Sequence, residues 1–173
     1  MAVKENVLSP QLKALGTSDL SPMIRMAGLM APRVIKAFLP GLDEKQKRAF
    51  EQVMPVGGEK KIYIQLMGTP TPPIVVGLSQ PMKLRNLPES KVREQQINGM
   101  RLTIDDLQLL SDGLTLGKML KLVWRLKGQI ITILKILLMF WPFIRLGPSE
   151  LKDLKEKMVT HFKPMLDLLP KPK

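Results

Sequence analysis

The chain has 173 residues, 45% of them hydrophobic and 24% charged, which is typical of a folded domain and excludes a disordered or membrane-embedded class. It has no cysteine, which excludes disulfide bonds, thiolate metal sites and cysteine nucleophiles. The net charge is +12, and residues 118–173 alone hold twelve Lys and Arg against four Asp and Glu. Such a basic surface attracts anionic partners, although solubility alone also explains it.

The first part of the chain predicts two helices. One begins at Ser21 as N-cap, and its apolar residues recur at spacings of three and four. Pro32 lies inside this pattern, so we expect a kink or two short helices. The second begins at Asp43, with Gln46 three residues later as the partner in a capping box.

The period of the pattern then changes to two, which predicts strands. Apolar and polar residues alternate over 62–66 and 74–78, and the proline-rich turn between them predicts a hairpin. A third short strand is predicted at 82–84 and a further strand at 100–104. The polar segment 88–96 is interpreted as a loop.

The second half of the chain is predicted to be mainly helical. Asp105 is expected to cap a helix with Gln108 as its capping-box partner. Residues 121–127 fit a helix or a strand equally well. Residues 129–141 predict a helix that is apolar almost all round, but about 20 Å is too short to span a bilayer, and Lys135 lies near its middle. A last helix is predicted from Gly147.

The residues offer little for catalysis. His161 is the single histidine, and Asp105 with Asp106 is the only adjacent carboxylate pair. The sequence contains no triad, no metal-ligand spacing and no phosphate-binding glycine loop, so we expect no enzyme, no metal and no cofactor. Nucleic-acid binding is not favoured, because exposed aromatic residues for base stacking are few. The first residues lack the apolar segment of a signal peptide, so we expect a cytoplasmic protein.

Two segments resemble the sterol carrier protein type-two family. Residues 105–113, directly after a predicted strand, are similar to the family's "D-L-x-x-L-x-x-G" element. Residues 124–129, leading into 133–137, are similar to its signature strand and closing helix. The resemblance implies an α+β fold with a mostly antiparallel five-stranded sheet covered by helices. It also implies that 121–127 is a strand and that an apolar tunnel holds a sterol, fatty acid or acyl chain.

The prediction is a single compact domain: an N-terminal helical extension (1–42), a sterol-carrier-like core (43–141) and a C-terminal helical extension (142–173). The twelve methionines and the apolar 129–141 segment favour an apolar ligand. We therefore expect non-catalytic binding or transfer of a lipid-like molecule in an internal cavity, with transient contact to anionic membranes. The residues predicted to line the cavity are Leu110, Met119, Leu122, Trp124, Ile133, Leu137, Phe140 and Phe143.

Two alternatives remain open. An apolar surface around 129–146 fits a protein- or membrane-docking module, which would bind liposomes or self-associate through an exposed face. An RNA-binding accessory protein is the third possibility, and its affinity would fall steeply with salt.

Overall fold

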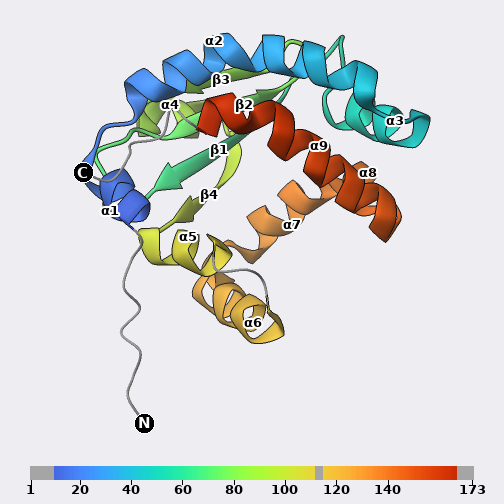
Figure 1. Ribbon diagram of the computed structural model, residues 1–173. Coiled ribbons are helices and arrows are strands. Elements are labelled where there is room, and N and C mark those ends of the chain that lie inside the picture. Colours follow the sequence, from blue (N-terminus) through green and yellow to red (C-terminus); the bar gives the residue numbers. More distant parts are fainter. Residues whose placement is uncertain (1–9, 112–114, 167–173) are drawn as a thin grey trace.

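The computed structural model describes residues 10–111 and 115–166, which form an α+β structure around one four-stranded sheet (Figure 1). The strands are β1 (Lys60–Leu66), β2 (Ile74–Leu78), β3 (Lys83–Asn86) and β4 (Asn98–Leu102), in the order β3-β2-β1-β4. β2 pairs antiparallel with β1 and with β3, which confirms the predicted hairpin. β4 pairs parallel with β1.

Helices surround this sheet, and they account for most of the chain. They are α1 (Pro10–Thr17), α2 (Ser21–Phe38), the short 3-10 turn η1 (Leu39–Gly41), α3 (Glu44–Val53), α4 (Glu89–Glu94), α5 (Ile104–Ser111), α6 (Leu116–Arg125), the 3-10 turn η2 (Lys127–Gln129), α7 (Ile130–Met139), α8 (Trp141–Ile144) and α9 (Pro148–Leu166). α2 packs against β3 and α9, α3 against α8, and α7 against β4. In Figure 1, α2 and α6 lie at opposite sides of the molecule.

The predicted five-stranded, mostly antiparallel sheet is wrong, because the sheet has four strands and one parallel pair. Residues 121–127, expected as the extra strand, lie in α6 and the start of η2. The parallel pair arises from α4, which occupies most of the segment interpreted as a loop. A helix between β3 and β4 carries the chain across the sheet, so that β4 runs parallel to β1.

The helix starts are decided by side chains next to them. The capping box of α3 is confirmed: the Gln46 N–H donates to Asp43 Oδ1 (2.8 Å), and the Asp43 N–H donates to Gln46 Oε1 (3.1 Å). In α5 the predicted pair is wrong. Thr103 and Asp106 exchange the hydrogen bonds instead, because β4 ends at Leu102 and Thr103 is the next residue with a side-chain acceptor.

The start of α2 also differs from the prediction. Leu20, not Ser21, occupies the N-cap position, and the Ser21 N–H donates to Asp19 Oδ1 at 2.9 Å. The helix continues through Pro32 as a single element, and it buries Ala31, Ile35 and Phe38. Packing of this face against the sheet and α9 therefore offsets the backbone hydrogen bond that the proline removes.

The hydrophobic core lies between the sheet and helices α2, α3, α7 and α9. Its buried members are Ile35, Phe38, Phe50, Val53, Met54, Ile62, Leu78, Ile136 and Leu154. The ring of Phe50 contacts the rings of Phe38 and Phe143, with centroids 5.8 Å and 6.2 Å apart. α7 contributes one buried residue, Ile136, to this core, so most of its apolar side chains lie outside the core.

Candidate docking face on helices α6, α7 and α8

Helix α6 carries an apolar stripe that nothing in the described part of the chain covers. Leu116, Leu120 and Val123 recur at spacings of four and three, so they share one side of the helix, and all are exposed. Trp124, next to them, is 71% exposed. α6 buries none of its residues and packs mainly against α5 and η2. Its basic residues, Lys118, Lys121 and Arg125, occupy the opposite side, and Arg125 contacts Asp106 of α5.

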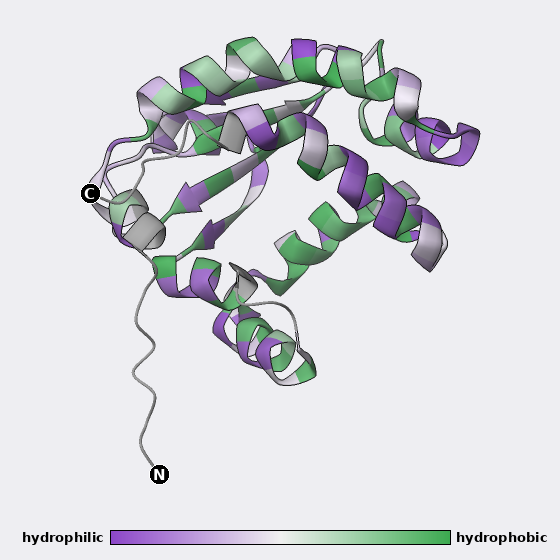
Figure 2. Cartoon of the chain, viewed as in Figure 1, coloured by the Kyte–Doolittle hydropathy of each residue, from purple (hydrophilic) through white to green (hydrophobic). Residues whose placement is uncertain are grey.

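α7 and α8 continue this exposed apolar surface. α7 is hydrophobic almost throughout in Figure 2, and only one side of it meets the core. We call the exposed apolar side chains of these three helices the docking face. It consists of Leu116, Met119, Leu120, Val123, Trp124, Ile130, Ile131, Leu134, Leu137, Leu138, Trp141 and Ile144. These are twelve of the nineteen large exposed hydrophobic residues that the described ranges contain, so most of this exposure is concentrated on three consecutive helices.

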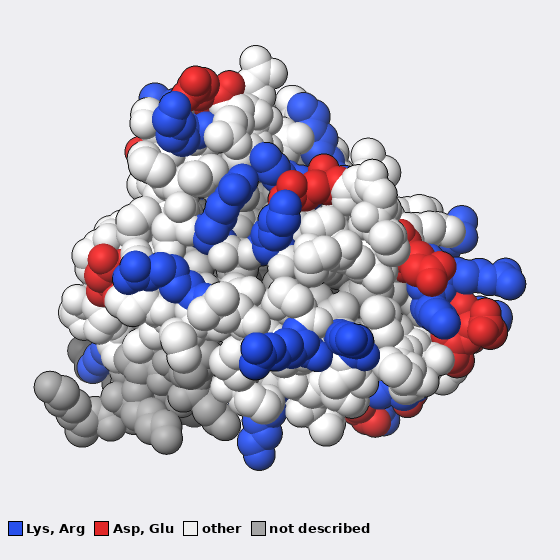
Figure 3. Space-filling view, turned by 90° about the horizontal axis from the view of Figure 1, so that it is seen from above, with Lys and Arg blue, Asp and Glu red and all other residues white. Residues whose placement is uncertain are grey.

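The charge of the same segment has one sign. Residues 115–149 contain six Lys and Arg and no Asp or Glu. The Nζ atom of Lys127 lies 4.3 Å from the ring centroid of Trp124, which places a cation directly beside an exposed indole. Elsewhere the charges are mixed: on the side that carries α2, basic side chains lie beside acidic ones in several places (Figure 3). The docking face therefore combines apolar side chains with positive charge alone.

Two side-chain contacts link α6 and η2 to α5 and β4. The Nε atom of Arg125 lies 2.6 Å from Oδ1 of Asp106, a carboxylate that is only 3% exposed. Burial by itself raises the pKa of Asp106, but hydrogen bonds from the Thr103 backbone and the Arg125 guanidinium outweigh it and hold the pKa below its usual range. The Gln129 amide accepts from the Arg101 N–H (2.7 Å) and donates to the Arg101 carbonyl (3.0 Å), as a neighbouring strand would.

The residues that were predicted to line one cavity differ in how exposed they are. Phe140 and Phe143 are half-buried and pack against the hydrophobic core. Leu122 and Ile133 are half-buried, whereas Met119, Trp124 and Leu137 belong to the docking face. Leu110 lies in α5, and its side chain is outside the described part. An enclosed cavity formed by these residues stays a prediction, and most of the exposed ones share an outer surface.

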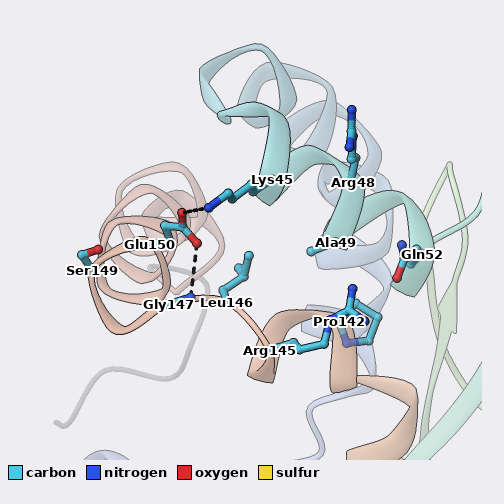
Figure 4. A pocket seen from close by; sticks show the side chains of 10 residues that line it. All are labelled: Lys45, Arg48, Ala49, Gln52, Pro142, Arg145, Leu146, Gly147, Ser149 and Glu150. Carbon is cyan, nitrogen blue, oxygen red and sulfur yellow. Dashed lines mark hydrogen bonds and ion pairs between the residues drawn. The ribbon is translucent and has the colours of Figure 1, made fainter.

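A hollow of about 540 Å³ lies between α3, α8 and the start of α9, but its lining is polar (Figure 4). Lys45 points toward Glu150, and Nζ lies 3.1 Å from Oε1. Oε2 of Glu150 also accepts from the Gly147 N–H at 3.2 Å. Arg48, Gln52 and Arg145 complete the polar lining. This hollow does not suit an apolar ligand, because burying these groups without partners is costly.

The docking-face residues that lie outside both the 129–146 surface and the predicted cavity lining are Leu116, Leu120 and Val123 on α6. Their spacing of three and four was readable, and a helix over 116–125 would have placed them on one side. Interpreting residues 121–127 as a strand obscured this helical spacing.

In residues 10–111 and 115–166, every helix falls short of the length and apolarity that a membrane-spanning segment needs. No three His, Asp or Glu side chains come together there in a way that would hold a metal ion.

In comparisons with known proteins, no protein-family model matches the chain, and no curated protein or solved structure matches it at a significant level. The resemblance to the sterol carrier family therefore stays a prediction.

Proposed function

We propose that this protein is a non-catalytic docking protein that attaches reversibly to anionic membranes through the docking face. The observation that carries the proposal is the set of twelve exposed apolar side chains on α6, α7 and α8. An amphipathic surface of this kind lies in the membrane interface, with its apolar side chains among the acyl chains and its basic residues at the headgroups.

Interfacial binding combines a hydrophobic and an electrostatic contribution, and the docking face offers both. Completely burying a Leu, Ile or Val side chain is worth about 1.5–3 kcal/mol, and the docking face offers many such side chains that are roughly half exposed. Each Lys or Arg near an anionic surface adds about 1 kcal/mol at moderate salt. Residues 115–149 contain six basic and no acidic residues, so an anionic bilayer does not repel this segment. These terms favour an anionic membrane over a neutral one.

The two tryptophans support the proposal that the docking face binds a membrane interface. Trp124 and Trp141 are the only tryptophans of the chain, and both are exposed on the docking face. Indole rings favour the boundary between headgroups and acyl chains, because one edge is apolar and the N–H remains hydrated. Lys127 beside Trp124 adds a headgroup contact at the same position.

The test is flotation with vesicles of phosphatidylcholine alone and of phosphatidylcholine mixed with phosphatidylglycerol, followed by tryptophan emission. We expect the protein to float with the mixed vesicles, and its emission to shift to the blue, because both indoles leave water. Salt should weaken the attachment without abolishing it, since the apolar term does not depend on ionic strength.

The result that overturns the proposal is equally direct. A protein that neither floats nor shifts its emission does not use this face for membranes. If light scattering shows a stable dimer and the dimer does not bind vesicles, a second copy of the chain covers the face instead. Equal binding to neutral and anionic vesicles would remove the role assigned to the basic residues.

A further inference from the structure

A second apolar surface lies on the other side of the molecule, in a groove between α2 and the edge strand β3. The groove is open to solvent and has a volume of about 530 Å³. Its walls include the apolar side chains of Leu29 and Pro32 from α2 and of Met82 and Leu84 from β3 and the residues before it. It lies away from the docking face, which occupies α6, α7 and α8 (Figure 1).

Gly28 lets α2 lie close to β3 at this groove. A Cβ atom on Gly28 would lie 2.6 Å from the carbonyl oxygen of Leu84, so only glycine lets α2 approach β3 this closely. The next residue, Leu29, is 73% exposed and is not covered by the described part of the chain. An apolar side chain therefore stands at the mouth of the groove, in contact with water.

The charged residues at the groove are all basic. Arg25 comes from α2, and Lys83 and Arg85 come from β3, where they alternate with the half-buried Leu84. Nζ of Lys83 lies 3.8 Å from Oε2 of Glu59, and Arg25 interacts electrostatically with Asp19.

The guanidinium of Arg85 makes no ion pair with any residue of the described ranges. No Asp or Glu lines the groove. The groove is thus apolar along its length and cationic at its rim.

We propose that this groove binds a fatty carboxylate, with the acyl chain along the apolar walls and the carboxylate at Arg85 and Arg25. A single acyl chain fits an open apolar groove, and arginine binds a carboxylate through two parallel N–H···O bonds. Neutral apolar molecules leave the Arg85 guanidinium without an ionic partner, and doubly charged polar anions leave the apolar walls exposed. The site does not depend on the docking face.

Calorimetric titration of the full chain with oleate, below its micelle concentration, tests this site. Arg85→Gln and Arg25→Gln should each weaken oleate binding about tenfold, because each removes a charged hydrogen-bond partner. Arg33→Gln is the matched control, since Arg33 is also exposed on α2 but does not line the groove. Methyl oleate, which lacks the charge, should bind about as weakly to the unaltered protein as oleate binds to the arginine variants.

Three results would overturn the proposal: no oleate binding to the unaltered protein, binding that both variants leave unchanged, or binding lost equally in the Arg33→Gln control. If Met119→Ala weakens oleate binding and the arginine variants do not, the acyl chain lies on the docking face and the groove is not its site. Arginine-dependent oleate binding by a protein that fails to float with vesicles would refute the membrane proposal alone.

Discussion

Replacing Met119 by alanine tests the docking face most selectively. Met119 lies beside the apolar stripe of α6, within the docking face, and is 47% exposed, so its side chain contributes little to the core. Methionine and alanine are both strong helix formers, and the substitution therefore leaves α6 intact. Met26 offers a matched control, because it is a methionine on another helix, α2, with 51% exposure and no place on the docking face or in the groove.

The expected magnitude follows from the exposed part of the side chain. The substitution removes three heavy atoms, and at about 0.8 kcal/mol for each buried methylene equivalent their complete transfer is worth about 2.4 kcal/mol. Only the fraction that is exposed in the free protein is gained on binding, which leaves about 1.1 kcal/mol for Met119. The partition coefficient for anionic vesicles should therefore fall about sixfold.

The measurement is a titration of each variant with phosphatidylcholine–phosphatidylglycerol vesicles, followed by the emission of the two tryptophans. Met26→Ala should bind as the unaltered protein does, and both variants should unfold at nearly the same temperature, because each changes an exposed position. Equal partitioning of the two variants would refute the reasoning, and so would a loss in both. A large drop in the melting temperature of Met119→Ala would show that α6 is covered in solution.

Two further predictions concern the framework that holds these surfaces. Asp106→Asn should lower the free energy of unfolding at neutral pH by about 2 kcal/mol, because it removes the charged partner of Arg125. Since the folded state depresses the pKa of Asp106, this stabilisation is present above the unfolded pKa and is lost as the pH falls through the folded one. Melting curves of the two proteins should therefore converge in acid, and a constant difference across the pH range would contradict the assignment. Gly28→Ala should destabilise the protein by about 1–3 kcal/mol through its clash with the Leu84 carbonyl, whereas Gly117→Ala, in an open helical position, should stabilise it by about 0.5–1 kcal/mol. Denaturant unfolding measures the change in the free energy of unfolding for both variants. If Gly28→Ala leaves this free energy unchanged, α2 does not approach β3 so closely.

Local patterns predicted several elements well, because the interactions that form them span only a few residues. The capping box of Asp43 and Gln46 needs residues three apart, and the hairpin of β1 and β2 needs alternation on both sides of a turn. The short helix α4 was missed because its segment is almost entirely polar. It is stabilised by the Glu89–Arg93 pair (2.6 Å) and by the buried Val92.

The segment 116–127 shows where a local pattern stops being decisive. Its apolar residues alternate over 122–126 and also recur every three or four residues from Leu116, so the strand and the helix are both consistent with it. The structure has the helix, which Thr115 begins by accepting a hydrogen bond from the Lys118 N–H (3.3 Å). In this helix the Arg125 side chain reaches Asp106, whereas in an extended segment it would point in a different direction.

The amino-acid pattern alone established the basic character of residues 115–149, their high apolar content and the absence of cysteine from the chain. Which apolar side chains are covered followed only from the three-dimensional packing. Ile136 is buried and Leu137, its neighbour, is exposed, because the core lies on one side of α7 and no described element lies on the other. Burial depends on partners distant in the sequence, such as β4 beside α7 and α2 beside β3. Local periodicity marks the apolar side of a helix, but it carries no information about what packs against that side.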